Sequence, residues 1–171
     1  MEPFFTKPEL PRYSQRPFPA YRFRPYPTGK RHPHPRTDPA GHSYQAEEEY
    51  LPSFSADDWR SCEPYLYGID LFNHAYWWET HEALETVWMA AGMRASRCGK
   101  VVQGLIQVSI AQLKRFIGVP EGARRLTASG VERMALADPV YLGIEMGPFI
   151  EDVQRCLRED RGEYPRIELH F

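Results

Sequence analysis

Long apolar runs and paired cysteines are both missing from this chain of 171 residues. No stretch approaches the roughly 20 apolar residues that a membrane-spanning helix requires, so we expect no membrane segment. The first residues also lack the charged, apolar and small-residue regions of a signal peptide. The three cysteines include no Cys-x-x-Cys pair, which favours reduced thiols and a cytoplasmic location over a disulfide framework.

Complete metal motifs are missing as well. The stretch "WWETHEALETVW" (77–88) contains His-Glu-x-x-Glu but lacks the second histidine of the zinc-protease pattern His-Glu-x-x-His. The chain has no Glu-x-x-His, the element that ferritin-like di-iron sites repeat on two helices. These gaps exclude a di-iron site and weaken a zinc-hydrolase interpretation.

Proline and positive charge are concentrated near the N-terminus. Ten of the 16 prolines lie in the first 40 residues, where "RPFPAYRF", "RPYPTGKR" and "HPHPRTDP" form a repeat with a period of eight. Residues 1–42 carry eight basic and three acidic residues, a net charge of +5, and the remainder has a net charge of −7. Because prolines lack the N–H that helices and central strands use, residues 1–52 are expected to form an extended, basic arm that is ordered only in part.

Three interpretations of this arm stay open. The favoured one is that the arm wraps its own domain and buries its aromatic side chains there, since solvated linkers rarely carry so many Phe and Tyr. Binding of nucleic acid through residues 1–42 is possible but not favoured. The third is that the arm is a ligand for the aromatic-lined groove of a protein partner.

From residue 55 onward the apolar spacing is helical, with almost no strand-like alternation. "SADDW" reads as a helix start with Ser55 as N-cap. The predicted helices that follow cover 64–73, 76–91, 100–117, 121–137 (interrupted by Gly130) and 148–159. The fold class is therefore all-α, a bundle of five to six helices over 53–162, with an extended C-terminal tail at 163–171.

The helix 76–91 has one polar pair at the edge of its apolar face. On a helical wheel His81 and Glu85 lie one turn apart beside the apolar arc. Glu79 and Glu82 point further round the helix, so we expect both to face solvent.

The helix 100–117 is apolar around most of its circumference, which predicts that it is the central helix. A narrow stripe of Gln103, Gln107 and Lys114 interrupts it. Gly104 lies beside this stripe and would let another helix approach closely. Buried glutamines need hydrogen-bond partners, because an unpaired amide costs roughly 1–3 kcal/mol.

These two helices suggest a shared polar site. One hypothesis is that His81, Glu85, Gln103 and Gln107 line a pocket for a small ligand or a metal. The simpler alternative is a satisfied polar network that fixes helix register. A further alternative is a hydrolase in which His81 and Glu85 bind a divalent metal and Glu82 acts as base.

Three segments resemble the domain-of-unknown-function family 309, a group of small prokaryotic all-α proteins without an established activity. They are "GIDLFNHAYWWETHEALETVW" (68–88), "QGLIQVSIAQLK" (103–114) and "EGARRL" (121–126). His74 departs from the small residue usual after the Leu-Phe-Asn element. The resemblance implies an all-α fold and no catalytic role, and its signature positions are Asn73, His81, Glu82, Glu85, Trp88, Gln103 and Gln107. All of these except Trp88 are the candidate pocket residues.

Overall fold

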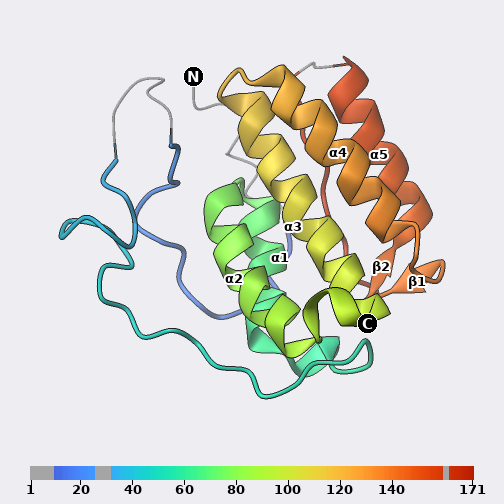
Figure 1. Cartoon of the computed structure of the whole chain (residues 1–171), viewed down its shortest axis with the longest axis horizontal. Coiled ribbons are helices and arrows are strands. Elements are labelled where there is room, and N and C mark those ends of the chain that lie inside the picture. The colour runs from blue at the N-terminus through green and yellow to red at the C-terminus, as the bar shows by residue number, and fades with distance from the viewer. Residues whose placement is uncertain (1–9, 26–31, 160–161) are drawn as a thin grey trace.

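The computed structural model describes residues 10–25, 32–159 and 162–171, and its regular structure is almost entirely helical (Figure 1). The helices are α1 (Glu63–Asn73), α2 (Trp77–Ala90), α3 (Arg97–Phe116), α4 (Pro120–Met134) and α5 (Met146–Glu159). Two 3₁₀ turns, Trp59–Ser61 and Met93–Ala95, and a hairpin of β1 (Val140–Tyr141) and β2 (Ile144–Glu145) complete the described elements. The all-α prediction is confirmed.

Local chemistry explains several of the helix ends. The Ser96 hydroxyl caps α3 by accepting a hydrogen bond from the Gly99 N–H at 2.8 Å. Pro120 opens α4, where its missing N–H leaves no helical hydrogen bond unmade. Gly92, directly after the last turn of α2, has a φ of +87°, a left-handed conformation that only glycine adopts without strain.

Helix α3 is the centre of the bundle, as its apolar circumference predicts. It packs against α2 on one side and α4 on the other, and Val101, Val102 and Leu105 are fully shielded between them. The closest approach lies at two glycines. A Cβ on Gly104 would stand 2.8 Å from the Gly130 carbonyl oxygen, and a Cβ on Gly130 would stand 2.9 Å from that of Gly104. The prediction that Gly104 admits a neighbouring helix is confirmed.

The same contact corrects the prediction of an interrupted fourth helix. Gly130 lies inside an unbroken α4, because close packing on α3 offsets the weak helix propensity of glycine. The segment "SADDW" forms no α-helix start: the Ser55 hydroxyl and N–H both donate to Asp58 at 2.8 and 2.7 Å, and a 3₁₀ turn follows. The hairpin β1–β2 is an element that the apolar spacing did not predict.

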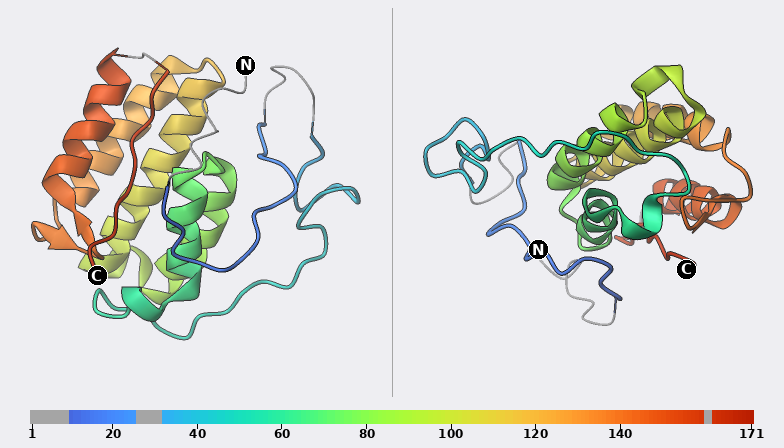
Figure 2. Two further views of the ribbon diagram at one scale, coloured as in Figure 1. Left: turned by 180° about the vertical axis from the view of Figure 1, so that it is seen from behind. Right: turned by 90° about the horizontal axis from the view of Figure 1, so that it is seen from below.

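The described part of the arm and the C-terminal tail lie against the helices (Figure 2). The tail, residues 163–171, is extended and runs along the bundle, with no strand pairing assigned. Its Tyr164 hydroxyl donates to the Asn73 carbonyl at 3.0 Å, and the His170 N–H donates to the Gly143 carbonyl at 2.8 Å. The described arm passes along α1 and α2, where Phe23 is only 7% exposed, and then returns through the exposed residues 44–50.

Candidate functional site

His81 and Glu85 lie on one edge of α2, as the wheel predicts. Their Nε2 and Oε2 atoms are 3.9 Å apart, and their side chains are 32% and 48% exposed. The ring of Trp78 lies 5.7 Å from the His81 ring, edge to face. Trp88 follows His81 by two helical turns and is half-buried on the same edge.

The register between α2 and α3 follows from two contacts near the start of α2. The Ser109 hydroxyl donates to the Trp77 carbonyl at 3.3 Å, and the Trp77 and Phe116 rings are 6.0 Å apart. Since the helices are antiparallel and rise about 1.5 Å per residue, His81 lies within about one turn of the level of Gln107. By the same spacing, Glu85 lies within about one turn of the level of Gln103.

Helix α4 also borders α3 at the level of Gln107. The Gly104–Gly130 contact fixes the antiparallel register of α3 and α4, so Thr127, three residues before Gly130, lies near the level of Gln107. A Cβ on Gly130 would be 3.4 Å from the Gln107 Cβ, which shows that Gln107 borders α4. Thr127 itself is 3% exposed.

We call this set the polar strip: His81 and Glu85 on α2, Gln103 and Gln107 on α3, and Thr127 on α4. Most of the described buried polar atoms without a hydrogen-bond partner lie in this strip or beside it, and the others include His74 Nε2 and Glu79 Oε2. Within the described part of the chain, several of the strip's solvent-shielded atoms and the two flanking indole nitrogens have no hydrogen-bond partner. They are His81 Nδ1, Gln103 Oε1, Gln107 Oε1, Thr127 Oγ1, and Nε1 of Trp78 and Trp88.

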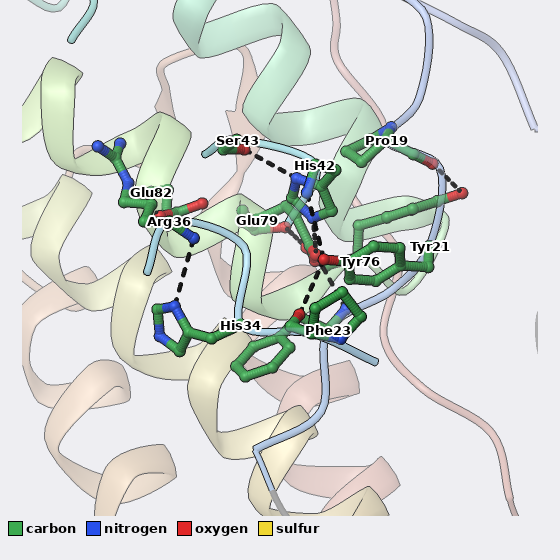
Figure 3. Close-up of polar contacts among 12 residues, drawn as sticks. Pro19, Tyr21, Phe23, His34, Arg36, His42, Ser43, Tyr76, Glu79 and Glu82 are labelled. Carbon is green, nitrogen blue, oxygen red and sulfur yellow. Dashed lines mark hydrogen bonds and ion pairs between the residues drawn. The ribbon is translucent and has the colours of Figure 1, made fainter. Parts of the chain in front are cut away.

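The prediction that Glu79 faces solvent is wrong. Its side chain is 4% exposed because the arm covers this face of α2 (Figure 3). Glu79 Oε1 accepts a hydrogen bond from the Phe23 N–H at 2.9 Å and lies 3.0 Å from His42 Nε2. The wheel placed Glu79 correctly on the side away from the core, but it could not foresee a segment more than 30 residues away in sequence.

Glu82 is also covered by the arm. Its carboxylate pairs with the Arg36 guanidinium at 2.6 Å, and its side chain is 16% exposed, less than a solvated face would give. Figure 3 shows this pair beside the contacts that Glu79 makes with Phe23 and His42. In this arrangement the Glu82 carboxylate is engaged by the Arg36 guanidinium, whose charge also interacts with Glu85.

Asn73 takes part in a different contact. Its amide donates to the Ile167 carbonyl at 2.7 Å and accepts from the Ile167 N–H at 2.8 Å, so both ends of the side chain bind the C-terminal tail. The Arg166 guanidinium donates to the Asn73 carbonyl at 2.8 Å. Asn73 therefore anchors the tail on α1.

The surroundings of His81 and Glu85 bear on the predicted metal site. Among the described residues, no group of three His, Cys, Asp or Glu side chains is placed to hold a metal ion, so His81 and Glu85 would need ligands from elsewhere.

Every arginine of the described arm contacts the chain itself, which lends no support to phosphate binding. The arginines are Arg12, Arg16, Arg22, Arg24 and Arg36. Over all the described residues, no helix combines the length and apolar character needed to cross a membrane.

Sequence reasoning missed Thr127 as a member of the polar strip and did not single out the indole of Trp78 that flanks it. Thr127 is one polar residue among many on α4, and only the α3–α4 crossing brings it to the strip. Trp78 lies just beyond His81 on the wheel, a position that gave a signal for proximity but none for an unbonded indole N–H.

Comparison with known families agrees with the segments identified in the sequence. Residues 65–126 match the family described as "Domain of unknown function (DUF309)", which confirms the resemblance. The match runs from α1 into α4 and includes His81, Glu85, Gln103 and Gln107, but stops one residue before Thr127. No curated protein matches the chain.

Proposed function

We propose that the protein is a binding module whose polar strip holds a small polar ligand. The family match itself assigns no activity. The observation that carries the proposal is the group of shielded, unbonded polar atoms contributed by α2, α3 and α4. Each such atom costs roughly 1–3 kcal/mol relative to a bonded one. Such atoms call for a partner, and a bound ligand, ion or water can supply it.

The chemistry of the strip defines the ligand class. A glutamine amide and a threonine hydroxyl both donate and accept hydrogen bonds, and one nitrogen of a neutral histidine does either according to its tautomer. Trp78 and Trp88 offer N–H donors and flat apolar faces. A matching ligand carries both donors and acceptors and has a planar or apolar edge. The unbonded atoms are shielded, so binding includes movement of the side chains above them.

The test compares two glutamines of α3. Gln112 is 2% exposed and its Oε1 accepts from Arg115 at 3.0 Å, whereas Gln107 Oε1 is unbonded. We expect Gln112→Met to lower the free energy of unfolding in urea by about 1–3 kcal/mol. Gln107→Met should leave it unchanged or raise it, because no existing hydrogen bond is lost.

Binding is measured in the same variants by the melting temperature with free amino acids and nucleosides as probes. At least one probe class should raise the melting temperature of the wild-type chain, and Gln107→Met should remove that rise. If no probe acts on the wild type and Gln107→Met costs as much as Gln112→Met, the strip is a structural network and the proposal fails.

A second candidate is a metal-assisted hydrolase, supported only by the His81–Glu85 pair at 3.9 Å. Glu82 would act as base, but it would first have to leave Arg36. Metal analysis of protein incubated with zinc, manganese or iron decides this candidate. Stoichiometric metal that Glu85→Gln abolishes would support it, and absence of bound metal would remove it.

A cytoplasmic location and a protein partner remain predictions. The three cysteines are free and buried, in agreement with the reduced thiols that the location requires.

A further inference from the structure

The first contact between the arm and the helices is centred on one buried carboxylate. Asp70, in α1, is fully shielded and accepts hydrogen bonds from the backbone N–H groups of Tyr13 and Ser14, both at 2.9 Å. Its Oδ2 also receives the Arg12 guanidinium at 2.8 Å. A single acid of the helical domain therefore holds three donors of the extended chain.

Two tyrosines then bind the proline carbonyls of the arm. The Tyr67 hydroxyl donates to the Pro17 carbonyl at 2.9 Å, and the Tyr76 hydroxyl donates to the Pro19 carbonyl at 3.4 Å. Phe18, between these prolines, stacks on the Tyr76 ring with centroids 5.0 Å apart and planes 13° apart. Aromatic hydroxyls that bind the free carbonyls of a proline-rich chain are a general feature of proline-rich peptide recognition.

A second arginine site and an apolar anchor follow. The Arg22 Nε donates to the His74 carbonyl at 2.9 Å, and its guanidinium lies 4.3 Å from the centroid of the Tyr76 ring. Phe23 is 7% exposed, and its N–H donates to Glu79 as Figure 3 shows. The face thus has an acid at each end and two tyrosines between them.

These contacts resemble those of a receptor with a bound peptide more than those of a chain that covers apolar surface. We propose that the face formed by Asp70, Tyr67, Tyr76, His74 and Glu79, called here the peptide face, recognises an extended segment of another protein. The segment has the pattern Arg-x-x-x-x-Pro-aromatic-Pro-x-x-Arg, and residues 12–23 occupy the face as a ligand in cis. This surface shares no residue with the polar strip, although the Phe23 ring packs at 5.0 Å on Trp78, which flanks the strip. The inference does not depend on a ligand in the strip.

The connection between arm and domain permits exchange. Residues 44–50 are all exposed, and the contacts of Tyr13, Pro17 and Pro19 with the helical domain join residues 50 to 57 positions apart in sequence. A tethered ligand has an effective concentration of about a millimolar. A second copy of the chain at micromolar concentration offers the same contacts, so its arm binds the face less than the tethered arm does. A segment of another protein that makes better contacts can displace the tethered arm, so we assign the face to another protein.

The experiment uses the full chain and a fluorescent peptide of residues 11–25, with anisotropy as the readout. The wild-type chain should bind the peptide weakly, because its own arm competes. The double variant Arg12→Ala/Phe18→Ala weakens the cis ligand and leaves the peptide face intact, so affinity for the peptide should rise about tenfold or more. Adding Tyr76→Phe or Asp70→Asn to that variant should reduce binding to the wild-type level or below.

A second route keeps the wild-type arm sequence. A specific protease site inserted after Glu48 allows the arm to be cut in the folded protein. The cut arm should remain bound until excess peptide displaces it.

Two results would overturn the assignment. One is a folded double variant and a cut protein that both fail to bind the peptide. The other is a wild-type dimer that forms with rising concentration and dissociates on addition of peptide, which would assign the face to the arm of a second copy. The variant Gln107→Met should bind the peptide as the wild type does, because Gln107 lies outside the peptide face. A failure of the small-ligand proposal would therefore be distinguishable from a failure of this one.

Discussion

At the scale of single residues, the bonding of each buried polar atom separates structural positions from candidate binding positions. Asn73 and Thr127 are both almost fully buried. Both amide atoms of Asn73 bind the backbone of Ile167, whereas the Thr127 hydroxyl has no partner among the described residues. Sequence alone assigned Asn73 to the candidate pocket and passed over Thr127, because residue type does not reveal which atoms are bonded.

This difference predicts opposite responses to nearly isosteric changes. Asn73→Leu should lower the free energy of unfolding by about 1–3 kcal/mol, since the N–H and carbonyl of Ile167 lose their partners. Thr127→Val should be neutral or stabilising because it removes an unbonded hydroxyl. Urea titration of both variants measures the effect, and a Thr127→Val loss as large as that of Asn73→Leu would mean that the hydroxyl is bonded in solution.

At the scale of elements, the crossing of α3 and α4 depends on two glycines facing each other. Gly104 and Gly130 bring the two backbones so close that either Cβ would meet the opposite carbonyl oxygen within 3 Å. A glycine inside a helix lowers its intrinsic stability by roughly 0.5–1 kcal/mol relative to alanine, and here close packing outweighs that loss. The crossing also brings Thr127 to the level of Gln107.

Alanine substitutions test this packing. Gly130→Ala should destabilise the protein by roughly 1–3 kcal/mol despite its better helix propensity, because the new Cβ overlaps a carbonyl and the Val108 side chain. Gly147→Ala, in the first turn of α5, is the control, since nothing lies within 4 Å of its Cβ position, and it should be neutral or slightly stabilising. Thermal unfolding of both variants gives the comparison, and equal effects would refute a tight crossing.

At the scale of the whole molecule, buried tyrosines join segments that are distant in sequence. The Tyr65 hydroxyl of α1 donates to the Leu142 carbonyl in the hairpin turn at 2.7 Å, and Tyr164 joins the tail to Asn73. Burial raises the pKa of Tyr65 well above its usual value of 10.0 and also raises that of Tyr164. Both groups must stay protonated to donate these hydrogen bonds.

The raised pKa values predict alkaline destabilisation. Above pH 10 the unfolded chain releases the tyrosine proton while the folded chain keeps it, so stability falls with rising pH until the folded pKa is reached. For Tyr65 the slope is about 1.4 kcal/mol per pH unit, and below pH 10 this contribution is constant. Urea midpoints from pH 8 to 11 should therefore fall more steeply for the wild type than for Tyr65→Phe. Parallel curves would show that Tyr65 does not contribute.

Much of the architecture could be predicted because helices are determined by local pattern. The spacing of apolar residues predicted α1 to α5 to within a few residues, and the largely apolar circumference of α3 indicated its central position. The wheel also gave the edge shared by His81 and Glu85. The period of a helix fixes which side chains share a face, whatever packs against it.

Only the tertiary structure decided what each face meets. The arm turned Glu79 from a solvent-facing acid into a buried acceptor, the tail took up Asn73, and α4 brought Thr127 to Gln107. Each of these arrangements brings together segments separated by 20 or more residues in sequence. The sequence by itself determined the helices and the faces they present. Which faces meet depends on backbone approach and chain path, which no local period encodes.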